Sequence, residues 1–116
     1  MRWRIFKEKC MEQKKENYLY KISLATQIGK KNGKLFLSVI QNKIDGFLEV
    51  LGRKQPFCGE KTASGCVLKG QLKTLVSVFD YTATGFFDDK SITLDIIYKH
   101  GVFHLTGNCE DYSVEN

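Results

Sequence analysis

The sequence predicts an all-β domain in which about eight antiparallel strands follow one another as an up-and-down meander. Short runs rich in Ile, Val, Leu, Phe, Tyr and Thr recur from Tyr18 onward, and turn dipeptides separate them about every ten residues. No stretch of comparable length keeps the apolar stripe of a helix. The chain has 116 residues, which is the size of one ordinary domain with a core of its own.

The first segment, residues 1–16, is expected to be a charged N-terminal extension. It holds six basic and three acidic residues, and its apolar side chains follow no strand or helix period. A second hypothesis concerns the start of translation, because Lys7-Glu8 can be encoded by AAGGAG, a bacterial ribosome-binding sequence, just upstream of Met11. Translation would then begin at Met11. The intact mass of the natural product distinguishes the two hypotheses, since a product that begins at Met1 contradicts the internal start.

The β domain is expected to span residues 17–108, with turn residues setting the ends of its strands. The expected strands lie near residues 18–28, 34–41, 46–52, 56–61, 66–71, 75–87, 91–98 and 102–107. The expected turns are Asn32-Gly33, Asp45-Gly46, Ser64-Gly65, Asp88-Asp89-Lys90 and His100-Gly101. Asn32-Gly33 suits a type I′ hairpin, since both residues tolerate positive φ. Pro56 falls in the connection Gly52–Phe57, where its missing N–H is tolerated.

Tight turns also predict how the strands are arranged. A parallel pair of strands needs a long crossover, so strands joined by short turns must be antiparallel neighbours. A meander of this length either closes or leaves two open edges, and a small closed or nearly closed barrel is the expected solution. An open curved sheet and two packed sheets are the alternatives. By strand count and connectivity alone, the pattern resembles calycin-like and streptavidin-like barrels, a resemblance that implies a fold and no function.

Alternation along the strands predicts which side chains face the interior. The last three strands are expected to contribute Phe79, Tyr81, Ala83, Leu94, Ile96, Phe103 and Leu105. The earlier strands are expected to contribute Tyr20, Ile22, Leu24, Leu35, Leu37, Val39, Phe47 and Leu51. Within this set, Tyr81, Leu94 and Phe103 are expected to be neighbours on three consecutive strands. They are therefore the candidate ligand-binding residues if the barrel holds a ligand, and packed core residues otherwise.

The charges are scattered rather than gathered into one patch. The net charge is +5, but basic residues are scattered among acidic ones through the β domain, which favours a solvated surface and no nucleic-acid partner. Residues 109–116 are expected to form an acidic tail. No run approaches the roughly 18 apolar residues of a membrane helix, and charges interrupt any signal-peptide core. We therefore expect a cytoplasmic protein with no membrane partner.

Candidate residues for chemistry are few. They are Cys10, Cys58, Cys66, Cys109, His100, His104, Asp88-Asp89 and Glu110-Asp111. Closely spaced cysteine pairs typical of zinc sites are absent from the sequence, so free thiols are expected, with a Cys58–Cys66 cross-strand disulfide as the alternative. The acidic pairs suit a turn and a solvated tail better than acid–base catalysis. We expect no catalytic residue, no metal site and no cofactor.

Two functional classes fit these expectations best. The first is a small non-enzymatic interaction or accessory module, which binds a protein partner or a second copy through its surface or an open edge strand. The alternative is a barrel that binds a small apolar or aromatic ligand, which requires an internal cavity of roughly 300 Å³ or more. An enzyme and a nucleic-acid binder are the least favoured classes.

Overall fold

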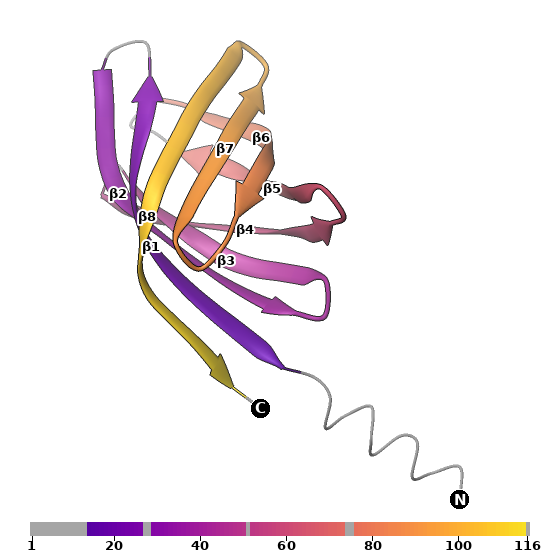
Figure 1. The fold of residues 1–116 in the computed structure, drawn as a ribbon. Coiled ribbons are helices and arrows are strands. Elements are labelled where there is room, and N and C mark those ends of the chain that lie inside the picture. Colours follow the sequence, from indigo (N-terminus) through magenta and orange to yellow (C-terminus); the bar gives the residue numbers. More distant parts are fainter. Residues whose placement is uncertain (1–13, 27–28, 51, 74–75, 116) are drawn as a thin grey trace, which may run out of the picture.

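The computed structural model describes residues 14–26, 29–50, 52–73 and 76–115 and confirms the predicted fold class. Eight strands form a closed barrel in which each pairs antiparallel with its neighbours in sequence, and the last pairs with the first (Figure 1). The strands are β1 (Lys15–Thr26), β2 (Gly29–Ile40), β3 (Lys43–Val50), β4 (Arg53–Thr62), β5 (Gly65–Lys73), β6 (Val78–Phe87), β7 (Ser91–Tyr98) and β8 (Gly101–Glu115).

Three of the expected turns are confirmed, and two are wrong. The strand ends match the turns at Ser64-Gly65, Asp88-Asp89-Lys90 and His100-Gly101. Asn32-Gly33 and Asp45-Gly46 instead lie inside β2 and β3. There the glycines allow close approach of neighbouring strands. A Cβ atom on Gly33 would lie 2.2 Å from the carbonyl oxygen of Glu49, and one on Gly46 would lie 2.0 Å from that of Phe36.

Pro56 is also placed differently from the prediction, because it lies inside β4 rather than in a connection. It pairs with Phe47 of β3, whereas the pairing of β4 with β5 begins only at Phe57. The missing N–H of Pro56 therefore falls beside the stretch where β4 has no β5 partner, which is the position in a sheet that tolerates proline.

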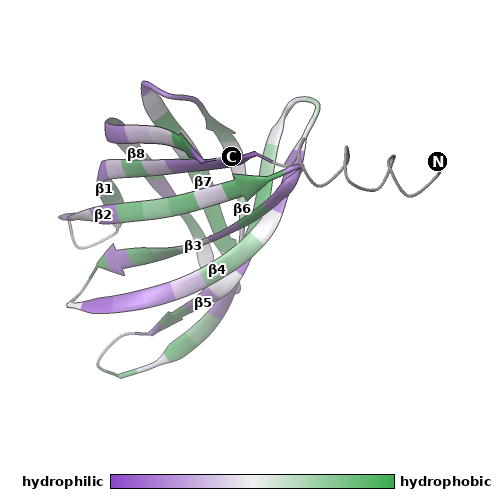
Figure 2. Ribbon diagram, turned by 90° about the horizontal axis from the view of Figure 1, so that it is seen from below, coloured by the Kyte–Doolittle hydropathy of each residue, from purple (hydrophilic) through white to green (hydrophobic). Residues whose placement is uncertain are grey.

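The core lies inside the barrel, and most of its predicted members are buried. The confirmed residues are Tyr20, Ile22, Leu24, Leu35, Leu37, Val39, Tyr81, Ala83, Leu94, Ile96 and Leu105. Figure 2 shows the alternation of hydrophobic and hydrophilic residues along the strands.

Phe47 was assigned to the wrong face of its strand. Its ring lies outside the barrel, 5.5 Å from that of Phe36, and Ile44 and Leu48 point inward in its place. The sequence predicts a turn at residues 45–46, but β3 already begins at Lys43. The predicted strand therefore started too late, and its inward and outward positions were interchanged. Phe79 and Phe103 are only half-buried, and Leu51 lies outside the described residues.

The end of β8 extends past the end of β7 and pairs with the start of β1, which also pairs with β2; we call these ends of β1 and β8 the arm. Residues 109–115, assigned from sequence to an acidic tail, continue β8, and Lys15 and Glu16, assigned to the N-terminal extension, begin β1. A bulge at Glu110 lets Tyr20 pair with Cys109 while Leu19 pairs with Asp111. Figure 1 shows the yellow end of β8 running out of the barrel beside the indigo start of β1.

Among the described residues, no helix is long and apolar enough to cross a membrane.

Candidate functional site

The barrel interior is packed around two of the three predicted ligand residues. Tyr81 and Leu94 line an internal pocket whose volume is about 10 Å³. A pocket for a drug-sized ligand needs roughly 300 Å³ or more, so this space holds none. Burial, reinforced by nearby Cys58, raises the pKa of Tyr81 to about 12. In this part of the barrel, Tyr81 and Leu94 act as core residues.

Phe103, the third predicted ligand residue, lies apart from that pocket. Its ring centroid is 4.7 Å from that of Tyr98 and 6.3 Å from that of Phe79. These three half-buried rings form an aromatic cluster beside the β7–β8 turn, packed against the core. The structure therefore brings together two of the three predicted residues and places the third at the end of the barrel.

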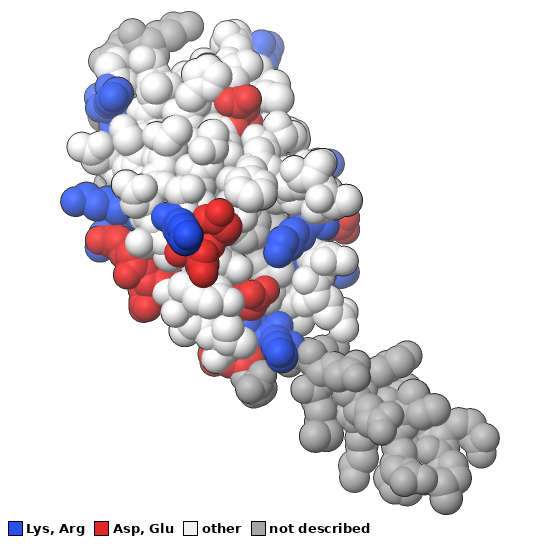
Figure 3. Space-filling model, viewed as in Figure 1, with Lys and Arg blue, Asp and Glu red and all other residues white. Residues whose placement is uncertain are grey.

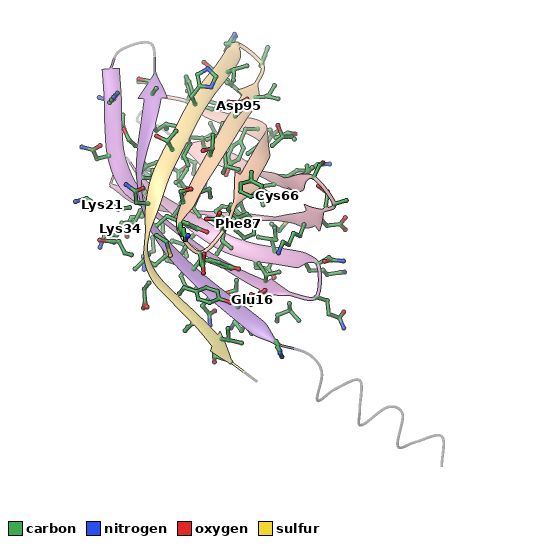
Figure 4. The ribbon with its side chains drawn as sticks, in the orientation of Figure 1. Glu16, Lys21, Lys34, Cys66, Phe87 and Asp95 are labelled. Carbon is green, nitrogen blue, oxygen red and sulfur yellow. The ribbon has the colours of Figure 1, made fainter. Side chains whose placement is uncertain are left out.

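A second aromatic cluster lies at the opposite end of the barrel, where the arm begins. The ring of Tyr18 lies 5.2 Å from that of Phe87 and 4.8 Å from that of Tyr112. The Tyr20 hydroxyl donates a hydrogen bond to the carbonyl oxygen of Asp88. Burial raises the pKa of Tyr18 and of Tyr20 well above the ordinary tyrosine value. These rings join the arm to the core; Figure 4 shows Phe87 and Glu16 at this end.

The cysteines do not form the cross-strand disulfide that the sequence left open. Cys58 is exposed on the outer face of the barrel and pairs with Lys69, whereas Cys66 is buried on the inner face. Their side chains therefore point to opposite sides of the sheet. Burial raises the pKa of Cys66 to about 11, although Lys61 opposes the shift. Cys58, Cys66 and Cys109 are free thiols, and Cys10 lies outside the described residues.

The histidine and aspartate candidates described next lie on the surface or form a turn. His104 Nδ1 lies 2.6 Å from Asp95 Oδ1, but both side chains are more than half exposed. Asp88 Oδ1 accepts hydrogen bonds from the N–H groups of Lys90 and Ser91, at 2.8 and 2.9 Å. These bonds lower the pKa of the Asp88 carboxyl. Within the described ranges, no group of three or more His, Cys, Asp or Glu side chains is placed to hold a metal ion.

Among the described residues, the longest stretch of strand with a partner on one side only is the edge of β8 in the arm, which we call the β8 edge (Glu110–Glu115). The pairing of β7 with β8 ends at Ser91 and Asn108, whereas β1 continues to pair with β8 as far as Glu115. In the part of the chain that the structure describes, the β8 edge therefore has a partner strand on one side only. The N–H and C=O groups that face away from β1 are a template for another strand.

Side chains on the two faces of the β8 edge differ in character. Tyr112 and Val114 are on the face that continues the barrel interior, opposite Tyr18 and Glu16, and are 38% and 46% exposed. The Tyr112 hydroxyl donates a 2.8 Å hydrogen bond to Glu16 Oε2, which fixes the ring. The other face carries Asp111, Ser113 and Glu115, all exposed.

Electrostatically, the β8 edge is acidic. It contains three acidic residues and no basic one. Figure 3 shows Asp and Glu side chains in the lower half of this view, with Lys and Arg side chains among them. Asn17 Nδ2 donates a hydrogen bond to Glu115 Oε2 at 2.5 Å, and Lys34 Nζ lies 3.7 Å from Glu110 Oε1. Among the described residues, neither Asp111 nor Glu115 forms an ion pair.

Sequence reasoning missed the β8 edge, although a signal was present. Residues 111–115 read Asp-Tyr-Ser-Val-Glu, in which polar and apolar side chains alternate with the period of a strand. The acidic composition favoured a solvated tail instead. Comparison with known proteins adds no further guide, because no protein-family model, no curated protein and no solved structure matches the chain.

Proposed function

We propose that this protein is a small, non-enzymatic interaction module whose packed barrel presents the β8 edge to another protein. One observation carries the proposal: the β8 edge pairs with β1 alone, so its second side offers main-chain donors and acceptors to an incoming strand. Adding a strand to an open sheet edge is a common mode of peptide recognition. The internal pocket of about 10 Å³ supports this function over that of a small-ligand carrier.

We also propose that the module works in a bacterial cytoplasm. Free thiols suit a reducing compartment, and the described cysteines are free. If AAGGAG is the sequence that encodes Lys7-Glu8, it would be a bacterial ribosome-binding sequence.

Native mass spectrometry of the protein purified from its own host tests the proposed function. We expect a folded chain without a small molecule, together with a complex that contains a second, different polypeptide. A co-purifying apolar or aromatic compound of defined mass, bound one to one and released on unfolding, would overturn the proposal in favour of a ligand carrier.

A further inference from the structure

Main-chain geometry at the β8 edge restricts what can bind there. Glu110–Glu115 are held extended by β1, which in turn is held by β2 through the pairing of Lys15 with Ile40. The arm is therefore preorganised, and a partner segment does not have to order it on binding. An incoming extended segment would make β8 an inner strand and satisfy its outward main-chain groups.

Side chains of the β8 edge determine the chemistry of that segment. Neighbouring side chains on one face of a strand pair interact directly, and opposite charges there are favourable. On the outer face, Asp111 and Glu115 favour Lys or Arg on the partner, although Lys15 of β1 already lies opposite Glu115. On the inner face, Tyr112 and Val114 offer half-exposed apolar surface that an apolar side chain would cover. The complementary segment is thus one in which basic and apolar residues alternate.

A second copy of this chain would meet like charges on the β8 edge in the antiparallel register centred on Ser113. Two copies paired antiparallel and centred on Ser113 would set Asp111 of each opposite Glu115 of the other. Like charges that face each other directly across a strand pair are destabilising. In that register, the charges that attract a basic segment work against pairing of the edge with itself.

We propose that the β8 edge binds an extended segment of a partner protein in which Lys or Arg alternates with apolar residues. This inference rests on the proposed function and adds the chemistry of the partner. Main-chain hydrogen bonds supply the alignment, the outer acidic side chains select the basic residues, and Tyr112 and Val114 pack against the apolar ones.

Titration of the full chain with a capped peptide, Lys-Val-Lys-Val-Lys-Val-Lys, tests this inference at low ionic strength. Fluorescence anisotropy gives the affinity, and hydrogen exchange shows which amides become protected. We expect saturable binding with new protection confined to Glu110–Glu115. A peptide with Glu in place of Lys, and one N-methylated at alternate residues along one edge, should each bind at least about tenfold more weakly.

Matched variants show whether the acidic edge is responsible. The double substitution Asp111→Lys, Glu115→Lys should weaken binding of the basic peptide at least about tenfold. The control, Glu60→Lys with Asp80→Lys, makes the same change of net charge on exposed positions of β4 and β6 and should change affinity less than about threefold. Circular dichroism confirms that each variant folds.

Several results would overturn the inference. Equal binding of the N-methylated peptide would mean that no strand is added, and equal loss in the control variant would mean that attraction is unspecific. A dimer of the full chain in sedimentation, with Glu110–Glu115 already protected, would assign the edge to a second copy. If the peptide does not bind, the inference about a basic and apolar partner segment is wrong. The proposed function is tested separately, by native mass spectrometry of the protein from its own host.

Discussion

Replacing Leu94 by Ala should test whether the interior is a packed core or a ligand chamber. Leu94 is 2% exposed on β7 and pairs with Leu105. The substitution removes three buried carbons, each worth ~0.8 kcal/mol, or ~2.4 kcal/mol together. The surroundings hold only about 10 Å³ of free space. A residual cavity of roughly 60 Å³ at ~24 cal/mol per Å³ adds ~1.4 kcal/mol. The expected loss in the free energy of unfolding is therefore about 4 kcal/mol.

Urea unfolding followed by far-ultraviolet circular dichroism measures this loss. Ile97→Ala is the matched control, because Ile97 lies on the same strand, carries as many side-chain carbons and is 45% exposed on the outer face. It should cost about 1 kcal/mol or less. Equal losses for the two variants, or a loss below about 1 kcal/mol at Leu94 accompanied by binding of an apolar dye, would refute a packed interior.

Three further outcomes follow from the structure. Gly33→Ala should lower the free energy of unfolding by at least ~1 kcal/mol in urea, because its Cβ would lie 2.2 Å from the Glu49 carbonyl oxygen; unchanged stability would contradict this contact. Under native conditions, iodoacetamide should alkylate the exposed Cys58 much faster than Cys66, because burial raises the pKa of Cys66 to about 11. Peptide mass mapping measures the two rates, and equal rates would contradict the burial of Cys66. The pKa of Asp88 is lowered in the folded protein, so its carboxylate stabilises the fold above the ordinary carboxyl pKa, and this stability is lost as the pH falls through the folded-state pKa. Asp88→Asn should therefore make the free energy of unfolding less dependent on pH in the acid range. An unchanged pH dependence would refute this role.

The fold followed from local features of the sequence, but the phase of some strands did not. β7 was predicted with the right limits, because its alternation runs unbroken from Ser91 to Tyr98 between two turns. In β3, Gly46 follows Asp45, which is the composition of a hairpin turn. Only the packing of β2 against β3 shows that this glycine accommodates the Phe36 carbonyl instead. A pairwise contact between strands is not visible in the local pattern of one strand.

The candidate site was less predictable than the fold. Tyr81 and Leu94 were correctly placed inside, since both lie on strongly alternating strands. Phe103 has the same phase, yet it is only half-buried because it lies near the end of the barrel beside Tyr98. Phase predicts the face of a strand that a residue occupies, whereas depth along the barrel axis depends on the lengths and register of all the strands.

The unequal lengths of neighbouring strands explain why a closed barrel still has an edge. Closure removes the edges of a sheet only where every strand has two partners. β8 has 15 residues and β7 has 8, so the second half of β8 outruns its neighbour and depends on β1 alone. An open edge of this kind invites pairing with other copies, and charged side chains are a common protection. The acidic residues of the β8 edge meet that need and, by the same electrostatics, favour a basic partner strand, so protection from self-pairing and selection of a partner have one physical cause.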